Sequence, residues 1–492
     1  MAHFSHDTPL EAVATASDLM ASFHALNVNS TSDAGGVPIS ILPDELLCEI
    51  FSYGVAGYND YGTGSIMEPN PGRAKAPFVR SAVCKRWREA CCSHAKLWHY
   101  VLVPNQESNG NTSFYLEIVL NRSREASIDI ILEHICERWD VGFEARVFPP
   151  LVAQRHRWRR FVVSVEPNST IKLLRLLCAP TPRLRTIQLS VHLNPAFRQF
   201  KIKNVDLQNF DASFDATAFL PYAPALYCIT TVNLQPLWDK WLATMQPSLG
   251  MLEVLHHAIS SSTVWSLLRR HTQLDWVVLG AAHLRPTLDH PGDLTLPRLD
   301  RLWIRFELSA MFVAHPTALR MPNLRKLVLD RHPTATAELH AFFQHLTATS
   351  SLSRLELRNV YHIGPGDVLA LAALDRLENV EIRHAQVCVS LFEHLAHPTK
   401  GNVMWPRLAC LELKRSHLDP TMERDFPCVL EFARMRRHPG PSDEENGHVK
   451  LRWVRCQLVL PDKDSGLSEE QVEEIAMIRN EIKSGIAHEQ RP

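Results

Sequence analysis

Apolar residues recur along most of the chain in a six-residue unit, L-x-x-L-x-L, which is the pattern of a short buried strand. From Leu274 onward the starting positions of the unit advance by 25, 25, 28, 25 and 31 residues. Helical patterns lie between the units, as in 339–346, where apolar residues stand at i, i+3, i+4 and i+7. Strands and helices that alternate at this period predict an α/β solenoid with a parallel sheet lined by helices.

Eight copies of the unit fit when related apolar residues are allowed, and two earlier copies are looser. The period is that of leucine-rich repeats, about 20 to 29 residues. A proline precedes the unit in Leu296-Pro-Arg-Leu299, Met321-Pro-Asn-Leu324 and Trp405-Pro-Arg-Leu408, where we expect it to keep the chain extended before the strand. The eight copies start at Leu184, Ile229, Leu274, Leu299, Leu324, Leu352, Leu377 and Leu408, and the looser ones are Trp158/Phe161/Val163 and Leu252/Leu255/His257.

Two amphipathic helices are predicted ahead of the repeats. In 41–51, Pro43 fits a first helical turn, and the apolar residues that follow it form one face. A second helix is expected from Phe78 to Trp98, since apolar or small residues recur there at three- and four-residue spacings. The stretch between them, Gly54 to Ala76, is rich in Gly, Pro, Asn and Asp and is predicted to be a loop insert.

These patterns divide the chain into four parts. Residues 1–40 are predicted to be an extension and linker, and 41–103 a small helical module that contains the insert 54–76. Residues 104–460 form the predicted repeat solenoid. Residues 461–492 are expected to hold a capping helix, at 468–484, and a tail, because the end of a solenoid must cover its core.

Composition narrows the class of protein. The 492 residues carry a formal net charge of -1, which provides no global attraction to nucleic acid or to an anionic membrane. The eleven cysteines are odd in number and never spaced as C-x-x-C, which favours reduced thiols in the cytoplasm or nucleus over disulfides or a zinc ribbon. No apolar run is long enough to span a membrane. We therefore expect neither a nucleic acid nor a membrane as a partner.

Two segments together resemble an F-box, the short helical module that docks a Skp-type adaptor in cullin-based ubiquitin ligases. They are LPDELLCEIF at 42–51 and VCKRWREACCSHAKLWHYV at 83–101, which match L-P-x-E-L-L-x-x-I-F, V-C-K-x-W-R and L-W in that order. Residues 113–132 and 155–163 are similar to segments of large families of fungal F-box proteins. The repeats are similar to those of the leucine-rich class of F-box proteins.

The resemblance implies a substrate receptor. Its helical module would bind the adaptor, and through it a cullin, while the solenoid would bind a target protein of unknown identity. The resemblance places adaptor contacts at Leu42, Pro43, Leu46, Leu47, Ile50, Phe51, Val83, Trp87, Leu97 and Trp98.

Other chemistry finds little support in the sequence. Trp87 and Trp98 fall on the apolar face of their helix, which favours packing over base stacking. Cys84, Cys91, Cys92 and His94 lack the spacing of a zinc site. No nucleophile, base and orienting acid can be selected. We therefore predict no catalytic residue, no metal and no cofactor, so the chain is not expected to be an enzyme.

One constellation could bind a target. Strand residues that alternate with the leucines should face the concave surface of the sheet, where they would form a glutamate column beside a mostly basic one. Two interpretations stay open: a self-neutralising charge network, or a target surface with Trp303 as an aromatic anchor. The candidate target-binding residues are Arg301, Trp303, Arg305, Lys326, Arg354, Glu356, Arg358, Glu381 and Glu412.

The sequence thus favours an F-box substrate receptor. The alternative is a repeat scaffold that binds a partner without joining a ligase.

Overall fold

The computed structural model divides into two compact units, Met1–Phe51 and Ser52–Pro492. The predicted N-terminal extension and the predicted capping helix at 468–484 both lie outside the described residues. None of the described helices is long and apolar enough to cross a membrane. The structure describes residues 42–56, 69–104, 111–135, 141–166, 170–191, 219–233, 249–285, 292–306, 311–312, 314–315, 317–330, 337–360, 362–387, 390–396, 404–418 and 453–459.

The helical part of the chain contains more helices than the sequence predicts. α2 (Asp44–Ala56) is followed by α3 (Pro71–Val83), α4 (Lys85–Ser93) and a short 3-10 helix, η2 (Ala95–Trp98). The two helices α2 and α3 therefore extend into both ends of the predicted loop insert 54–76. Its second end is helical because Pro71 occupies the first turn and the side chain of Asn70 caps the helix, accepting a hydrogen bond of 2.9 Å from the backbone N–H of Arg73.

The prediction of one helix from Phe78 to Trp98 is wrong. Cys84 adopts an extended conformation between α3 and α4, and its Sγ accepts a hydrogen bond of 3.4 Å from the backbone N–H of Trp87. Cys84 thus takes the place of a helix N-cap, a position at which serine or aspartate is the usual signal. His94 is extended as well and separates α4 from η2.

The repeat sheet begins earlier than expected, within the last residues of the predicted helical module. β1 (Tyr100–Val103) pairs in parallel with β2 (Ile128–Ile135), so it is the first strand of the sheet. Parallel pairing then continues along a sheet of fifteen described strands, in the order β1-β2-β3-β4-β5-β6-β7-β9-β11-β12-β14-β16-β15-β13, with β17 also paired to β16. The further strands are β3 (Trp158–Val165), β4 (Thr186–Val191), β5 (Cys228–Val232), β6 (Met251–Ser260), β7 (Trp276–Arg285), β9 (Arg301–Phe306), β11 (Lys326–Asp330), β12 (Arg354–Arg358), β13 (His362–Ile363), β14 (Asn379–Arg383), β15 (Gln386–Val387), β16 (Cys410–Leu418) and β17 (Trp453–Val459).

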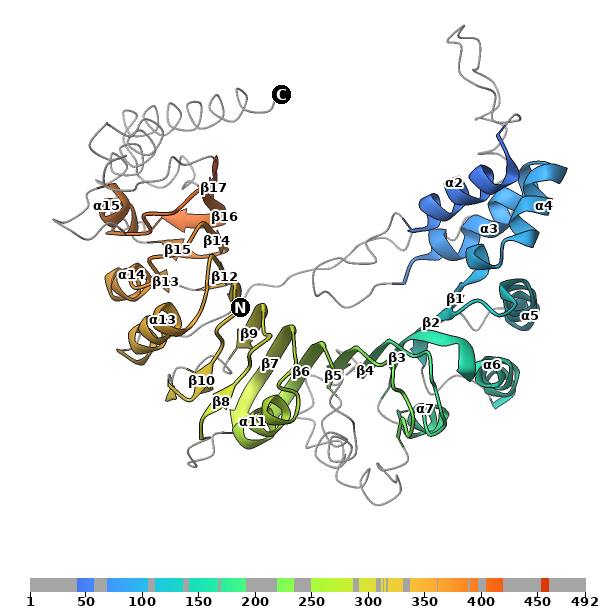
Figure 1. The fold of residues 1–492 in the computed structure, drawn as a ribbon, viewed down its shortest axis with the longest axis horizontal. Helices are drawn as coiled ribbons and strands as arrows, with labels where there is room; N and C mark the ends of the chain where they lie inside the picture. The colour runs from blue at the N-terminus through green and yellow to red at the C-terminus, as the bar shows by residue number, and fades with distance from the viewer. Residues whose placement is uncertain are drawn as a thin grey trace, which may run out of the picture. The chain divides into compact units, whose positions relative to one another are not determined.

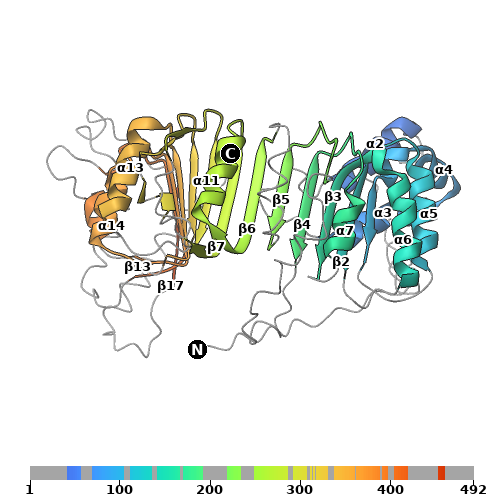
Figure 2. The same cartoon turned by 90° about the horizontal axis from the view of Figure 1, so that it is seen from below.

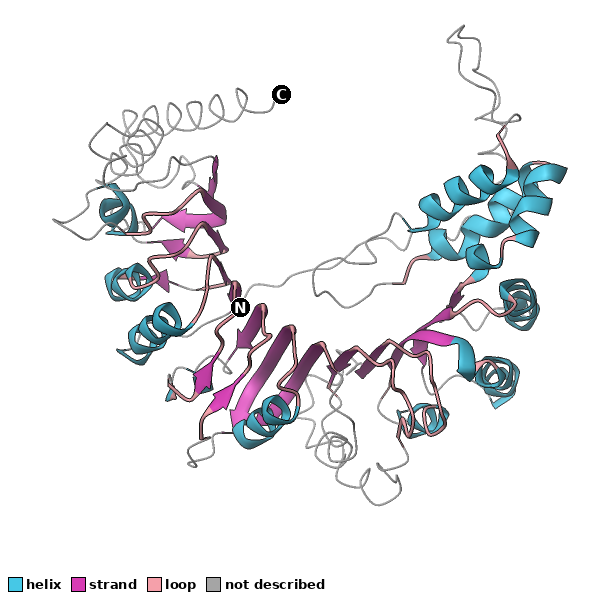
Figure 3. Cartoon of the chain, viewed as in Figure 1, coloured by secondary structure: helices cyan, strands magenta, loops and turns pink. Residues whose placement is uncertain are grey.

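Helices line one side of this sheet (Figures 1 and 2). The opposite side of β4 to β16 carries no described helix, and we call it the open face (Figure 3). A separate two-stranded sheet pairs β8 (Leu294–Thr295) with β10 (Leu319–Arg320). The arrangement confirms the predicted α/β leucine-rich-repeat solenoid. The lining helices are α5 (Asn111–Ser123), α6 (Val141–Ala153), α7 (Thr170–Leu176), α11 (Ser261–Arg270), α13 (Ala337–Thr349), α14 (Pro365–Ala372) and α15 (Ser390–Ala396).

The strand register confirms most of the predicted leucine units and corrects two. Ile229 pairs with Ile187 on one side and with Leu252 on the other. The unit in β5 is therefore Leu226/Ile229/Thr231, not one that starts at Ile229, and the unit in β6 is Leu249/Leu252/Val254, not Leu252/Leu255/His257. All six of these side chains are buried.

The prolines before the strands act differently from the expectation. In Leu296-Pro-Arg-Leu299 the backbone N–H of Leu299 donates to the carbonyl of Leu296. In the same way, the N–H of Leu324 donates to the carbonyl of Met321, and the N–H of Leu408 to the carbonyl of Trp405. Each proline is thus the second residue of a β-turn, where its fixed φ is favourable. The turn, rather than an extended lead-in, positions the start of each strand.

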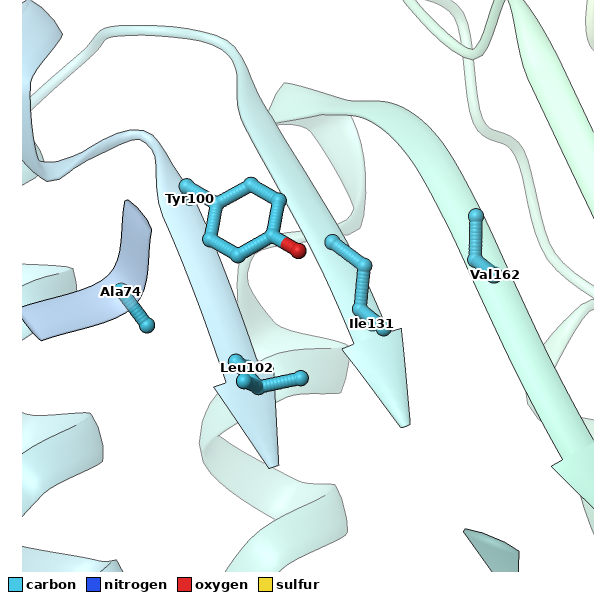
Figure 4. Close-up of a cluster of buried hydrophobic side chains, with 5 residues drawn as sticks. All are labelled: Ala74, Tyr100, Leu102, Ile131 and Val162. Atoms are coloured by element: carbon cyan, nitrogen blue, oxygen red, sulfur yellow. The ribbon is translucent and has the colours of Figure 1, made fainter. Parts of the chain in front are cut away.

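The side of the sheet opposite the lining helices changes character from β1 to β16. On the first three strands Leu102, Ile131 and Val162 lie side by side in register and are buried together with Tyr100 and with Ala74 of α3 (Figure 4). From β9 onward the equivalent positions are mostly charged. Candidate binding chemistry on the open face is therefore concentrated on β9 to β16.

Candidate functional site

Three adjacent strands carry a cation at the same position of the open face. Arg301 of β9 pairs in register with Lys326 of β11, which pairs with Arg354 of β12. We call these three residues the cationic ladder. Alternation along each strand directs Leu302, Leu327 and Leu355 into the core and leaves the ladder on the open face.

The predicted glutamate column is confirmed by the register. Glu356, Glu381 and Glu412 occupy one position on β12, β14 and β16, and we call them the glutamate column. Two residues further along the same strands, a column of cations runs beside it. These cations, the paired column, are Arg358, Arg383 and Lys414.

The glutamate and paired columns neutralise one another through short contacts. Arg358 and Arg383 approach Glu356 at 2.6 and 3.2 Å. Lys414 lies 2.8 Å from both Glu381 and Glu412. Burial favours a raised pKa for Glu381, but hydrogen bonds from Arg383 and Lys414 outweigh it and hold the pKa at about 2. This part of the face supports the interpretation of a structural charge network.

Trp303, predicted as an aromatic anchor, is already in contact with cations of its own chain. The guanidinium carbons of Arg305 and Arg358 lie 4.0 and 4.3 Å from the centroid of its ring. Such cation–π contacts hold both arginines against the sheet. A role for Trp303 in target binding stays a prediction. The two arginines leave only part of its ring available to a target.

Sequence reasoning missed a buried carboxyl group on the same face. Glu253 of β6 is buried and accepts a hydrogen bond of 3.2 Å from the hydroxyl of Thr230 on β5. Burial raises the pKa of Glu253 to about 7, against the opposing effects of Thr230 and the charge of Arg305. A β6 unit that starts at Leu252 does not assign Glu253 to the open face. The corrected unit, Leu249/Leu252/Val254, does.

The absence of a side chain at Gly280 leaves room for the side chain of Arg305 on the open face. A Cβ at Gly280 would lie 2.8 Å from Leu255 and 3.1 Å from the Cβ of Arg305, too close for either to stay in place. The Nε of Arg305 also lies 3.7 Å from a carboxylate oxygen of Asp330. Arg305 therefore links Trp303, Asp330 and the region of Glu253.

The residues predicted to bind an adaptor differ in accessibility on α2. Leu46 and Ile50, one turn apart, are 47% and 49% exposed, and Pro43 is exposed as well. Leu47 and Phe51 are buried and Leu42 is half-buried. Buried side chains have no surface to offer an adaptor, so on α2 we narrow the predicted contacts to the accessible residues.

The same distinction applies to the following helices. Val83 is exposed and Trp87 half-buried, but Leu97 and Trp98 are buried. The indole N–H of Trp98 donates to the carbonyl of Cys91 at 2.7 Å, and Phe78 packs edge-on against its ring at 4.9 Å. Trp98 and Leu97 thus stabilise the module from inside. Cys84, Cys91 and Cys92 are free thiols, and no group of metal-binding side chains occurs in the described ranges.

Comparisons with known proteins identify no family. No family model and no curated protein matches the sequence. Among solved structures the chain is similar to an internalin from Listeria monocytogenes, with 11% sequence identity and a TM-score of 0.26, over 69% of this chain and 87% of the internalin. The leucine-rich-repeat architecture is therefore assigned from the strand register of the chain itself.

Proposed function

We propose that this chain is a non-catalytic substrate receptor of a Skp/cullin/F-box ubiquitin ligase. The observation that supports the proposal most is the ordered F-box pattern at 42–51 and 83–101, which runs from just before α2 into that helix, and from the end of α3 through α4 and η2 to the start of β1. The repeat sheet that follows has an open face with an excess of cations, which is a surface on which a target could bind.

A receptor of this kind would act by tethering alone. The helical module would hold the adaptor and cullin, and the open face would hold the target. A separate conjugating enzyme would then modify lysines of the target. Tethering raises the local concentration of one partner beside the other, to millimolar values for short flexible links.

The accessible residues of α2 carry the proposed adaptor contact. Leu46 and Ile50 expose about half of their side chains although both are large and apolar. Their i, i+4 spacing places them on one face of the helix. Burying that face against a partner would remove apolar surface from water, at roughly 25 cal/mol per Å².

The second candidate is a repeat scaffold that binds a protein without joining a ligase. It is favoured by the open face, whose charged columns need no adaptor to bind a partner. The two candidates make opposite predictions for a Skp-type adaptor, while both assign the target to the sheet.

Co-purification with a Skp-type adaptor tests the proposal, with one exposed leucine as the variant and another as its control. We expect Leu46→Asp to reduce adaptor recovery by at least about tenfold, because it places a charge on an apolar contact. Leu369→Asp changes a leucine of similar exposure on α14, away from the F-box segments, and should leave recovery unchanged. Equal losses in both variants, or no recovery with the unaltered chain, would favour the scaffold.

A further inference from the structure

We propose that the cationic ladder, Arg301, Lys326 and Arg354, binds a short acidic polypeptide segment of the target, whose carboxylates bridge the three strands. This inference rests on the proposed function in assigning the target to the open face, and it adds the chemistry of the segment that is recognised.

The ladder places like charges next to one another in a way that folding alone does not favour. Neighbouring strands lie about 4.8 Å apart, so the three cations begin from positions that span about 10 Å. Like charges directly opposite each other on a sheet are destabilising. Violations of such local rules are expected at functional sites. A ligand of opposite charge would compensate this one.

The contacts that the ladder residues make within the chain leave them available to a ligand. Arg354 is exposed, and its side chain makes no hydrogen bond or ion pair with any residue in the described part of the chain. Lys326 lies 3.2 Å from Glu356, but Glu356 also binds Arg358 and Arg383. Glu356 therefore keeps two cations if Lys326 turns toward a ligand.

Arg301 is held in a position suited to an incoming anion. Its Nε lies 3.2 Å from Asp300, in a pair that is about half exposed on both sides, and such pairs contribute only about 0 to 1 kcal/mol. Its guanidinium carbon lies 5.4 Å from the ring centroid of Trp276 on β7, the neighbouring strand of the sheet. The ring supports the guanidinium without consuming any N–H donor, so the donors other than Nε–H can bind a carboxylate.

The charge of the face agrees with an acidic ligand. The three open-face positions shared by β9, β11, β12, β14 and β16 hold seven cations and four carboxylates, although the whole chain carries a net charge of -1. Each of the four carboxylates pairs with a cation of the paired column or with Arg305, so the three cations in excess are those of the ladder. The cations are Arg301, Arg305, Lys326, Arg354, Arg358, Arg383 and Lys414, and the carboxylates are Asp330, Glu356, Glu381 and Glu412.

The limited length of the ladder favours an acidic peptide over a nucleic acid. Beyond Arg354 the same position is occupied by Asn379 and Cys410, with the glutamate column beside them. A nucleic acid requires a longer track of cations for its phosphates and would be repelled by those glutamates. A few acidic residues of an extended chain, rising about 3.3 Å each, cover the 10 Å span.

Fluorescence anisotropy with a labelled oligoglutamate peptide tests the inference on the full chain. We expect saturable binding that weakens with added salt, no binding of an oligolysine peptide, and weaker binding of a single-stranded oligodeoxythymidylate than of oligoglutamate. The triple variant Arg301→Gln, Lys326→Gln, Arg354→Gln should bind oligoglutamate at least about tenfold more weakly. The charge-matched control is Arg146→Gln, Arg175→Gln, Arg320→Gln, which changes exposed arginines of α6, α7 and β10 and should bind as the unaltered chain does.

Three outcomes would overturn the inference: equal weakening in the control, oligodeoxythymidylate binding at least as tight as oligoglutamate binding, or no oligoglutamate binding at all. Adaptor co-purification with the same triple variant separates this result from the proposed function. If the triple variant still co-purifies with the adaptor but loses peptide binding, both proposals are supported. If the unaltered chain co-purifies with the adaptor but binds no oligoglutamate, only the ladder proposal is rejected. If the unaltered chain binds oligoglutamate but no adaptor, only the ligase proposal is rejected.

Discussion

His271 shows how a single residue can set the acid sensitivity of a repeat. It opens the β-turn before β7, at the position that Leu296, Met321 and Trp405 occupy in later repeats. Its side chain is 1% exposed, and both ring nitrogens lack a hydrogen-bond partner among the described residues. Burial, aided by the charge of Arg270, lowers the pKa of His271 from 6.5 to about 4. The histidine is therefore neutral in the folded chain.

Replacing His271 with methionine should make the repeat more resistant to acid. Between pH 6.5 and 4 the unfolded chain binds a proton at His271 that the folded chain does not, so folding stability falls as the pH falls. From pH 7 to pH 5 this loss is about 2 kcal/mol in the unaltered chain. Urea unfolding at both pH values should show a smaller decrease in His271→Met. An equal decrease in the two proteins would contradict the assignment of a neutral buried histidine.

At the scale of elements, the glutamate column joins strands that lie far apart in the sequence. Glu356 of β12 has a side chain that is 3% exposed, and it contacts cations from β11, β12 and β14. Removing one member of such a cluster leaves the remaining charges without compensation, which costs more than the pair itself contributes. The column thus stabilises β11 and β12, two of the three strands that present the cationic ladder.

Glu356→Gln should therefore destabilise the chain by about 2 kcal/mol, because Arg358, Arg383 and Lys326 lose the carboxylate that they share. Glu117→Gln, at an exposed position of α5, is the matched control and should change stability by less than about 0.5 kcal/mol. Thermal unfolding of both variants measures the difference. A Glu356→Gln variant as stable as the control would show that the column contributes nothing to folding.

The accuracy of sequence prediction differed between elements for physical reasons. Buried leucines repeat at a fixed spacing, so the parallel sheet and its charged columns could be predicted from alternation alone. The frame failed at β5, where Thr231 fills a buried position that a leucine holds elsewhere. The break at Cys84 could not be predicted, since a thiol is an unusual N-cap. The contacts of Trp303 with Arg358 join residues two strands apart, which no local pattern specifies.

At the scale of the whole molecule, the chain combines a short helical module with a long repeat sheet. The first carries the two segments that resemble an F-box, with Leu46 and Ile50 accessible on α2. The second carries the cationic ladder on its open face. This separation predicts that adaptor binding and target binding can be removed independently, which the leucine and ladder variants test.

The most direct measurement of the central claim is size-exclusion chromatography with light scattering on the full chain mixed with a purified Skp-type adaptor. We predict a complex whose mass equals one copy of each protein, and its loss in Leu46→Asp but not in Leu369→Asp. Separate elution of the unaltered chain and the adaptor would contradict the account and leave the chain a repeat scaffold outside any ubiquitin ligase.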